Sequence, residues 1–299
     1  EAAPLDETTW RVTIVGYDFP GELSIICGLF FVHGFNILDG DVFTYEPEEP
    51  ANQESTPSKR LRPGFGLPRR LRADSPPQPS RPKIVDVFTV KSVFLEPHSP
   101  EIWDRYILEL YDLLAKLRAG QRREARGALA KRVGAAFQVI PGKSSPLLPI
   151  DIEIDNAASE RYTVLRINAP DTVGFLYEFT NALAFTRTNI ARMVVRTVGT
   201  RAQDALYVTD SEGRKIESPQ KQRELRAAIV LIKHFTHLLP HSPNPEAALL
   251  HFREFIYQLF QRPNWPDEIA SLERSDVLKA LARVLGVSDF LWDDFLRMQ

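Results

Sequence analysis

The sequence predicts an α+β fold made of two similar units with antiparallel sheets, followed by an all-helical C-terminal segment. The first observation is an internal duplication, because the pattern Asp-x-x-Gly-x-Leu occurs at Asp18–Leu23 and again at Asp171–Leu176. Each Gly is followed fifteen residues later by Asn-Ile, at 36–37 and 189–190, so the copies keep a constant offset of 153 residues. The second observation is that the same order of expected elements surrounds both copies.

These elements follow from the spacing of apolar residues. Alternating, β-branched stretches predict strands, and stretches with apolar residues on most turns predict helices. Strands are expected at 10–17, 37–45 and 86–91 in the first unit and at 162–169, 190–198 and 204–210 in the second. Helices are expected at 22–35, 100–118, 175–188 and 219–239. This order, completed by a strand from beside it, is typical of a ferredoxin-like βαββαβ sandwich with two helices on one face of an antiparallel sheet.

The spacing of the third strands indicates an insertion in the first unit. These strands begin at Asp86 and Asp204, which are 118 residues apart rather than 153. Residues 47–82 supply the 35 extra residues and, being rich in Pro, Ser and Arg, are predicted to be disordered, although their basic runs would also suit an acidic partner or an RNA. The predicted organisation is a first unit at 1–118, a helix and linker at 119–149, a second unit at 150–241 and a helical segment at 242–299.

The repeated turn is the candidate binding site. A helix that starts at glycine leaves free backbone N–H groups, and a ligand carboxylate can come close because no Cβ intervenes. The Asp of each turn would then accept from the ammonium group of an α-amino acid. The alternative is that each Asp is an ordinary N-cap and each Gly ordinary turn chemistry. The candidate ligand-binding residues are Asp18, Phe19, Pro20, Gly21, Glu22, Leu23, Asn36, Ile37, Asp171, Thr172, Val173, Gly174, Phe175, Leu176, Asn189 and Ile190.

The two turns, the Asn-Ile strand starts and the strand Asp204–Asp210 resemble the ACT domain, a small-molecule-sensing module. The second copy, with Ile152–Ser159 before it, is similar to the C-terminal ACT repeats of bacterial PII uridylyltransferase, in which a leading strand completes the sheet. The resemblance spans most of residues 9–118 and 150–239. It departs from the family pattern at Val173, where Pro is usual, and at Glu22, where an apolar residue is commoner.

The resemblance implies two ACT units paired by their sheets or helices, within the chain or across a homodimer. It implies a small amino acid, glutamine above all, as the ligand, no cofactor, and a role in reporting nitrogen status to a nucleotidyltransferase acting on glutamine synthetase or a PII protein. The run Val284–Leu291 is similar to a segment near the start of glutamine synthetase adenylyltransferases, and we expect the chain to be the front of a longer protein. The alternative is a structural module whose turns bind nothing and whose sheets and helical tail dock a partner protein.

Composition narrows the function classes. The formal net charge of −2 argues against a nucleic-acid-binding protein. The single cysteine, Cys27, lies among apolar residues, so we expect it to pack rather than react, in a reducing, cytoplasmic setting. No apolar stretch reaches the length of about 18 residues needed to span a bilayer, and the N-terminus lacks the basic start and apolar run of a signal peptide.

Catalytic and metal-binding patterns are missing from the sequence. It contains no Gly-Ser followed by two aspartates one residue apart, no Walker loop, no G-x-S-x-G and no H-E-x-x-H, so we expect no catalytic residues here. His234, His237 and His241 have helical spacing, but Pro240 breaks the helix and no carboxylate or Cys joins them nearby, so we expect no metal site. The basic run at 118–138 predicts an amphipathic helix whose charges face water.

Overall fold

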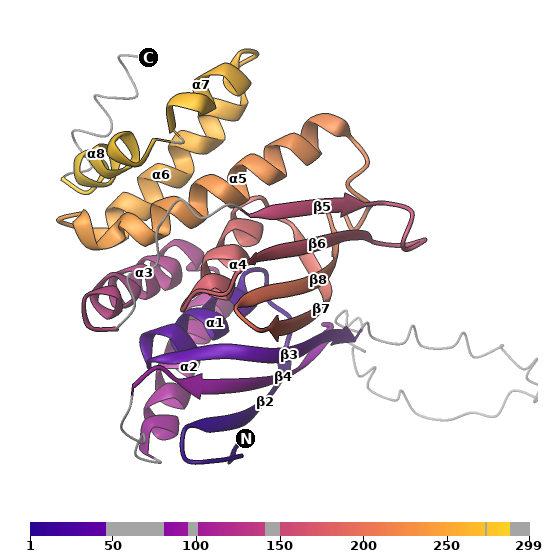
Figure 1. The fold of residues 1–299 in the computed structure, drawn as a ribbon, viewed down its shortest axis with the longest axis vertical. Helices are drawn as coiled ribbons and strands as arrows, with labels where there is room; N and C mark the ends of the chain where they lie inside the picture. Colours follow the sequence, from indigo (N-terminus) through magenta and orange to yellow (C-terminus); the bar gives the residue numbers. More distant parts are fainter. Residues whose placement is uncertain (46–80, 95–100, 141–149, 273, 288–299) are drawn as a thin grey trace, which may run out of the picture.

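One continuous eight-stranded sheet runs through the molecule in the order β1-β2-β4-β3-β7-β8-β6-β5, and every neighbouring pair is antiparallel (Figure 1). A computed structural model describes residues 1–45, 81–94, 101–140, 150–272 and 274–287. Nearly all of the expected insertion at 47–82, most of the linker before the second unit and the expected last helix at 289–297 lie outside the described residues.

The predicted antiparallel strands and the predicted helices are present. The first half of the sheet contains β1 (Ala2–Pro4), β2 (Thr9–Tyr17), β3 (Phe35–Tyr45) and β4 (Lys83–Ser92), with α1 (Glu22–Val32) and α2 (Glu101–Arg118). The second half contains β5 (Asp151–Asp155), β6 (Thr163–Pro170), β7 (Asn189–Val198) and β8 (Arg201–Thr209), with α4 (Phe175–Phe185) and α5 (Pro219–Leu238). The remaining elements are α3 (Arg122–Val139), a short 3-10 turn (Leu239–His241), α6 (Pro245–Phe260), α7 (Trp265–Leu272) and α8 (Ser275–Leu285).

Strand β1 was not expected from the sequence. It has only three residues, too few for an alternating pattern to show, and it pairs with β2 through Ala2 opposite Val12. The N-terminal ammonium group of Glu1 extends this pairing by donating to the Thr13 carbonyl oxygen at 2.9 Å. Both outer strands of the sheet are therefore short, which is a common feature of sheet edges.

The two halves join along β3 and β7, which pair from Asp39 opposite Arg196 to Phe43 opposite Arg192. The Arg196 guanidinium crosses this seam and lies 2.9 Å from an oxygen of Asp39 and 3.4 Å from an oxygen of Asp41. Arg192 lies over the Phe43 ring, 5.3 Å from its centroid. The association of the two units is therefore made within the chain, by backbone hydrogen bonds between sheets.

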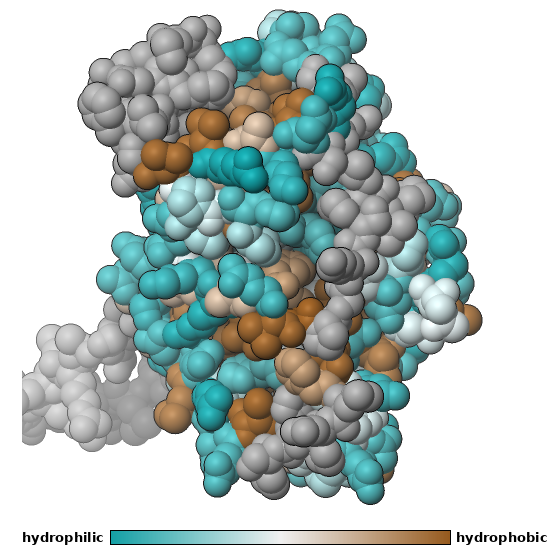
Figure 2. Space-filling view, turned by 60° about the vertical axis from the view of Figure 1, so that its left-hand side comes forward, coloured by the Kyte–Doolittle hydropathy of each residue, from teal (hydrophilic) through white to brown (hydrophobic). Residues whose placement is uncertain are grey.

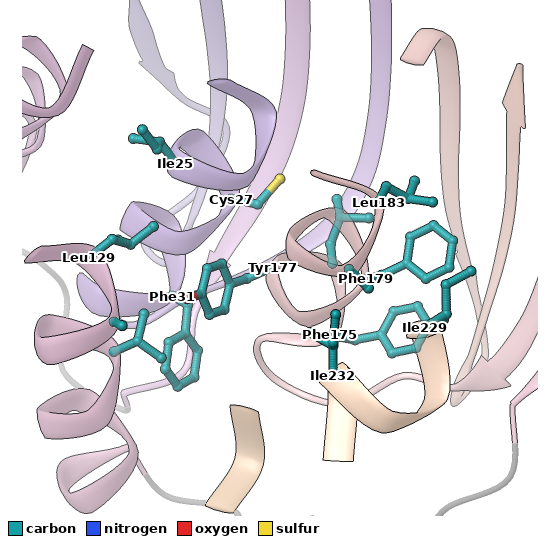
Figure 3. Close-up of a cluster of buried hydrophobic side chains, with 14 of the residues drawn as sticks. Ile25, Cys27, Phe31, Leu129, Phe175, Tyr177, Phe179, Leu183, Ile229 and Ile232 are labelled. Atoms are coloured by element: carbon teal, nitrogen blue, oxygen red, sulfur yellow. The ribbon is translucent and has the colours of Figure 1, made fainter. Parts of the chain in front are cut away.

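The helices gather on one face of the sheet, with α1 and α4 side by side beneath the seam. Glycine at position 28 permits this approach, because a Cβ there would lie 2.8 Å from both the Tyr177 ring and the Leu129 side chain. Figure 3 shows Tyr177 and Phe31 between these helices, with Leu129 reaching in from α3. Cys27, 1% exposed, belongs to the same apolar core.

The outer helices complete the layer. Helix α3 packs against α1, α2 and α6, and α6 in turn packs against α5 and α8. The surface on this side is largely hydrophilic, with apolar side chains exposed in separate patches (Figure 2). Within the described part of the chain, no helix combines the length and the apolar character needed to cross a membrane.

The contact at Gly28 gives a first prediction. In an isolated helix, Gly→Ala adds about 1 kcal/mol of stability. In Gly28→Ala the new methyl group meets two core side chains, and overpacking typically costs about 1–3 kcal/mol, so we expect net destabilisation in urea-induced unfolding.

The matched control is Gly127→Ala in α3. A methyl group at position 127 meets the carboxylate end of Glu246, a half-buried side chain that can swing away. We therefore expect this variant to be as stable as the parent or more so. Equal effects of the two substitutions would contradict the proposed close packing of α1 on α4.

Candidate functional site

The two predicted turns have the same backbone geometry. Gly21 and Gly174 precede α1 and α4 with φ of 92° and 86°, in the left-handed region that favours glycine. In the first turn the Glu22 N–H donates to the Phe19 carbonyl at 2.8 Å, and in the second the equivalent bond of Phe175 also measures 2.8 Å. The duplication seen in the sequence is therefore a duplication of local structure.

Neither aspartate caps its helix, so the N-cap interpretation is wrong. Glycine is the N-cap residue of both helices, and neither helix has a side-chain capping hydrogen bond at its N-terminus. Asp18 and Asp171 lie three residues earlier, where each backbone N–H is held by a carbonyl at 2.9 Å, from Pro82 and Thr200 respectively. Neither carboxylate therefore caps the helix that follows it.

The structure groups the predicted residues across the two halves rather than within each copy. Six residues of the first turn, 18–23, line one cavity together with Asn189 and Ile190. Asn36 and Ile37 line a second cavity together with Asp171, Gly174, Phe175 and Leu176. Thr172 and Val173 line neither cavity. The antiparallel β3–β7 pairing causes this exchange, because it places the start of each seam strand against the helix turn of the other half.

The second cavity is filled. It measures about 10 Å³, room for at most one water molecule. The Phe31 ring packs against the second turn, where a Cβ on Gly174 would lie 2.9 Å from it. The Asp171 carboxylate accepts hydrogen bonds from the Asn36 amide at 3.3 Å and the Thr197 hydroxyl at 3.2 Å. The second turn is therefore occupied by the protein's own side chains.

The first cavity is open and measures about 1240 Å³. Phe31, which fills the second cavity, corresponds in the duplication to Ala184, 153 positions later. Ala184 lines the first cavity and has only a methyl group where the second cavity has the phenyl ring of Phe31. The equivalents of the two donors to Asp171 are also engaged elsewhere: Asn189 donates to the Asp210 carbonyl and Thr44 to the Ile190 carbonyl. The Asp18 carboxylate consequently accepts no hydrogen bond from the described residues and remains available to a ligand.

One wall of the first cavity is acidic. Glu22 accepts a hydrogen bond from the Phe19 N–H at 3.0 Å, and burial raises its pKa to about 8. Burial likewise raises the pKa of Asp86 to about 7 and raises that of Asp18. Asp86 is 1% exposed, and one of its oxygens has no hydrogen-bond partner among the described residues. Glu22 and Asp86 can therefore hold a proton near neutral pH, and all three carboxyl groups, when ionised, can accept from an ammonium group.

The same cavity is also lined by arginines, which sequence reasoning missed. Arg126 of α3 reaches the first turn, where a Cβ on Gly21 would lie 3.0 Å from its Nη2, and it donates to the Ala184 carbonyl at 3.4 Å. Arg253 of α6 is 9% exposed and lies over the Phe185 ring, 5.1 Å from its centroid. The expectation that the charges of the 118–138 helix face water is wrong for Arg126, because α3 is packed on three sides.

One acidic residue of the first cavity, Asp86, could have been found by extending the duplication to the third strand of each unit. Asp86 and Asp204 lie at equivalent positions inside β4 and β8, and each lines the cavity of its half. Arg126 and Arg253 belong to helices outside the repeated pattern, so no sequence signal placed them near the turn.

Of the three histidines at 234, 237 and 241, His237 lies 3.3 Å from Glu178. Lys233 also lies 3.5 Å from Glu178, and this buried contact joins α4 to α5.

Comparisons with known proteins agree with the ACT resemblance. Residues 151–236 match a family described as an ACR9-like, ACT-like domain. The chain is 30% identical over 223 residues to the bifunctional uridylyltransferase/uridylyl-removing enzyme of Rhodopseudomonas palustris, covering 74% of this chain and 19% of that protein. The enzyme of the same description from Bradyrhizobium sp. (strain ORS 278) is 31% identical over 220 residues, with 74% and 19% covered, and that from Gluconobacter oxydans is 26% identical over 235 residues, with 77% and 20% covered.

The chain therefore spans about a fifth of the length of these relatives. No solved structure matches it. The homology extends beyond the family match at 151–236, since the aligned share is 74% of the chain.

The buried acids give a second prediction. A carboxyl group whose pKa is raised by folding binds its proton more tightly in the folded state, so stability is full below the unfolded pKa and falls as pH rises. For Glu22 the loss of stability runs from pH 4.5, the ordinary pKa of a glutamate, to about pH 8. The free energy of unfolding falls by at most about 1.4 kcal/mol per pH unit in this range. We expect Glu22→Gln, which keeps an oxygen for the Phe19 N–H, to flatten the loss of stability in urea titrations between pH 5 and 8. Parallel curves for parent and variant would contradict this.

Proposed function

Because residues 151–236 form an ACT-like domain and the chain is homologous to part of bacterial uridylyltransferases, we propose that it is a regulatory module that binds a small amino acid in the first cavity. Glutamine is the leading ligand, as the family resemblance implies. The observation that carries the proposal is the contrast between two equivalent turns, of which one faces an open cavity and the other is filled.

The walls of the first cavity suit both ends of an α-amino acid. The free Asp18 carboxylate, with Asp86 behind it, can accept from the ammonium group. The N-terminus of α1 beyond Gly21, together with Arg126, can bind the carboxylate. In this proposal the second turn, 171–176, is a structural copy that holds the halves together.

Binding there would act on the arrangement of the whole helical layer. The cavity is lined by the first turn, by α3, by α4 and the start of β7, and by α6, so one ligand would contact both halves of the sheet and the C-terminal helices. A ligand that binds one arrangement of these elements more tightly shifts the population toward it. We propose that the remainder of a longer protein, a nucleotidyltransferase acting on PII or glutamine synthetase, responds to this shift.

The test of the proposal is a thermal-shift scan of the chain against the twenty amino acids. Glutamine at about 100 times its Kd should add roughly 2.7 kcal/mol of stability and raise Tm. Asp18→Asn should abolish the shift. Its matched control, Asp171→Asn, weakens hydrogen bonds in the filled cavity and should lower Tm without changing the glutamine response. No response to any amino acid at millimolar concentration would favour the alternative of a docking module that binds no ligand.

The chain itself suggests a blocking substitution. Ala184→Phe places in the first cavity the side chain that plugs the second, at the equivalent position. We expect this variant to fold and to lose amino-acid binding, as measured by calorimetry, while Ala184→Ser keeps the parental affinity. Unchanged binding to Ala184→Phe would place the ligand elsewhere.

A further inference from the structure

The first cavity contains more positive charge than the carboxylate of one amino acid requires. Arg253 is nine-tenths buried, and its Nη1 atom has no hydrogen-bond partner in the described part of the chain. The Nε atom of Arg126 is buried and unpartnered there in the same way. Burial, and then the neighbouring Arg126, lower the pKa of Arg253 to about 9. Within the described residues, neither guanidinium group forms an ion pair with a carboxylate. Such an arrangement is costly until an anion is supplied.

A third arginine supports this. Arg187 lines the same cavity with a φ of 54°, in the left-handed region where a residue other than glycine is strained. The equivalent residue of the first half, 153 positions earlier, is Gly34 with a φ of 75°. The second half thus carries an arginine where the first half has glycine, the residue that this backbone conformation prefers, and this arginine is exposed at the lining of the cavity.

The acidic wall does not balance these arginines. Burial raises the pKa of Asp86 to about 7 and that of Glu22 to about 8, so at neutral pH Asp86 is partly and Glu22 mostly protonated. Arg122 and Arg123 add exposed positive charge to the lining. The five arginines of the lining outnumber its four carboxyl groups, Asp18, Glu22, Asp86 and Glu254. The cavity as a whole is therefore electropositive next to the N-terminus of α1, which itself favours anions.

We propose that the first cavity binds a small organic molecule with at least two negative charges, whose carboxylate or phosphate groups lie between Arg126 and Arg253. This deepens the proposed function, since it names the ligand class of the same site. An amino acid with a neutral side chain has one carboxylate, which can pair with one of the two guanidinium groups. A ligand with a second anionic group can pair with both. Arginine forks bind carboxylate and phosphate groups in the same bidentate geometry, so both chemistries fit.

The test compares ligand pairs that differ by one anionic group. Glutamate against glutamine probes a second carboxylate, and O-phosphoserine against serine probes a phosphate. By calorimetry on the full chain at low and moderate salt, we expect the charged member of at least one pair to bind about tenfold tighter or more, and added salt to weaken it. The pair that shows the difference identifies the chemistry. Equal or tighter binding of the neutral member in both pairs overturns the inference.

Variants separate a charge effect from a loss of fold. Arg253→Gln and Arg126→Gln should each weaken the charged ligand about tenfold, while Arg223→Gln on the exposed surface of α5 should leave it unchanged. Without ligand, Arg253→Gln should not lower Tm, since it removes an unpaired buried charge. Arg187→Gly should weaken the charged ligand and keep Tm, because glycine relieves the strained backbone. Full affinity in all three cavity variants overturns the inference.

The results distinguish this inference from the function on which it rests. If glutamine binds and its binding is lost in Asp18→Asn, but no charged ligand binds more tightly, the sensing role stands and the inference fails. If only the charged members bind, and Arg253→Gln weakens them, the inference stands and glutamine is excluded as the ligand. If nothing binds, both fail.

Discussion

The antiparallel pairing of β3 with β7 is the interaction on which the arrangement of the site depends. It joins two half-sheets into one and brings α1 and α4 into contact beneath the seam, where Gly28 allows them to approach. Because the paired strands run in opposite directions, the start of each lies against the helix turn of the other half. Each cavity is consequently built from both halves, and neither half alone contains a complete site.

Within this near-symmetric frame a few side chains decide which cavity is open. Phe31 plugs the second cavity, and its counterpart Ala184 leaves the first one empty. Hydrogen bonds follow the same division, since Asn36 and Thr197 satisfy Asp171 whereas Asp18 accepts none from the described residues. A cavity the size of an aromatic ring in a packed core lowers stability, so the Phe31 ring also stabilises the packing of the two halves against each other. One copy of the turn is thereby filled by the protein's own side chains, and the other lines an open cavity.

Electrostatics distinguish the open cavity from an ordinary packing defect. Carboxyl and guanidinium groups with little exposure line the same cavity at the junction of α1, α3 and α6, and the described residues show no ion pair between them. Groups of this kind are expensive to bury and usually have a functional reason. Because the arginines come from helices outside the duplicated pattern, the ligand would couple the sheet to the helical part of the chain. That coupling is what a regulatory module requires.

The sequence by itself determined the duplication, the order of strands and helices, the glycine at the start of α1 and of α4, and the ACT resemblance, because these depend on local periodicity and on turn chemistry. Fourteen of its sixteen candidate residues line one of the two cavities. It did not reveal that Asn189 belongs with Asp18 rather than with Asp171, nor that Arg126 and Arg253 face Gly21. The three-residue strand β1 was likewise invisible to a periodicity argument. Only the tertiary structure decided these points, since strand pairing across the seam and helix packing bring together residues that no sequence spacing connects.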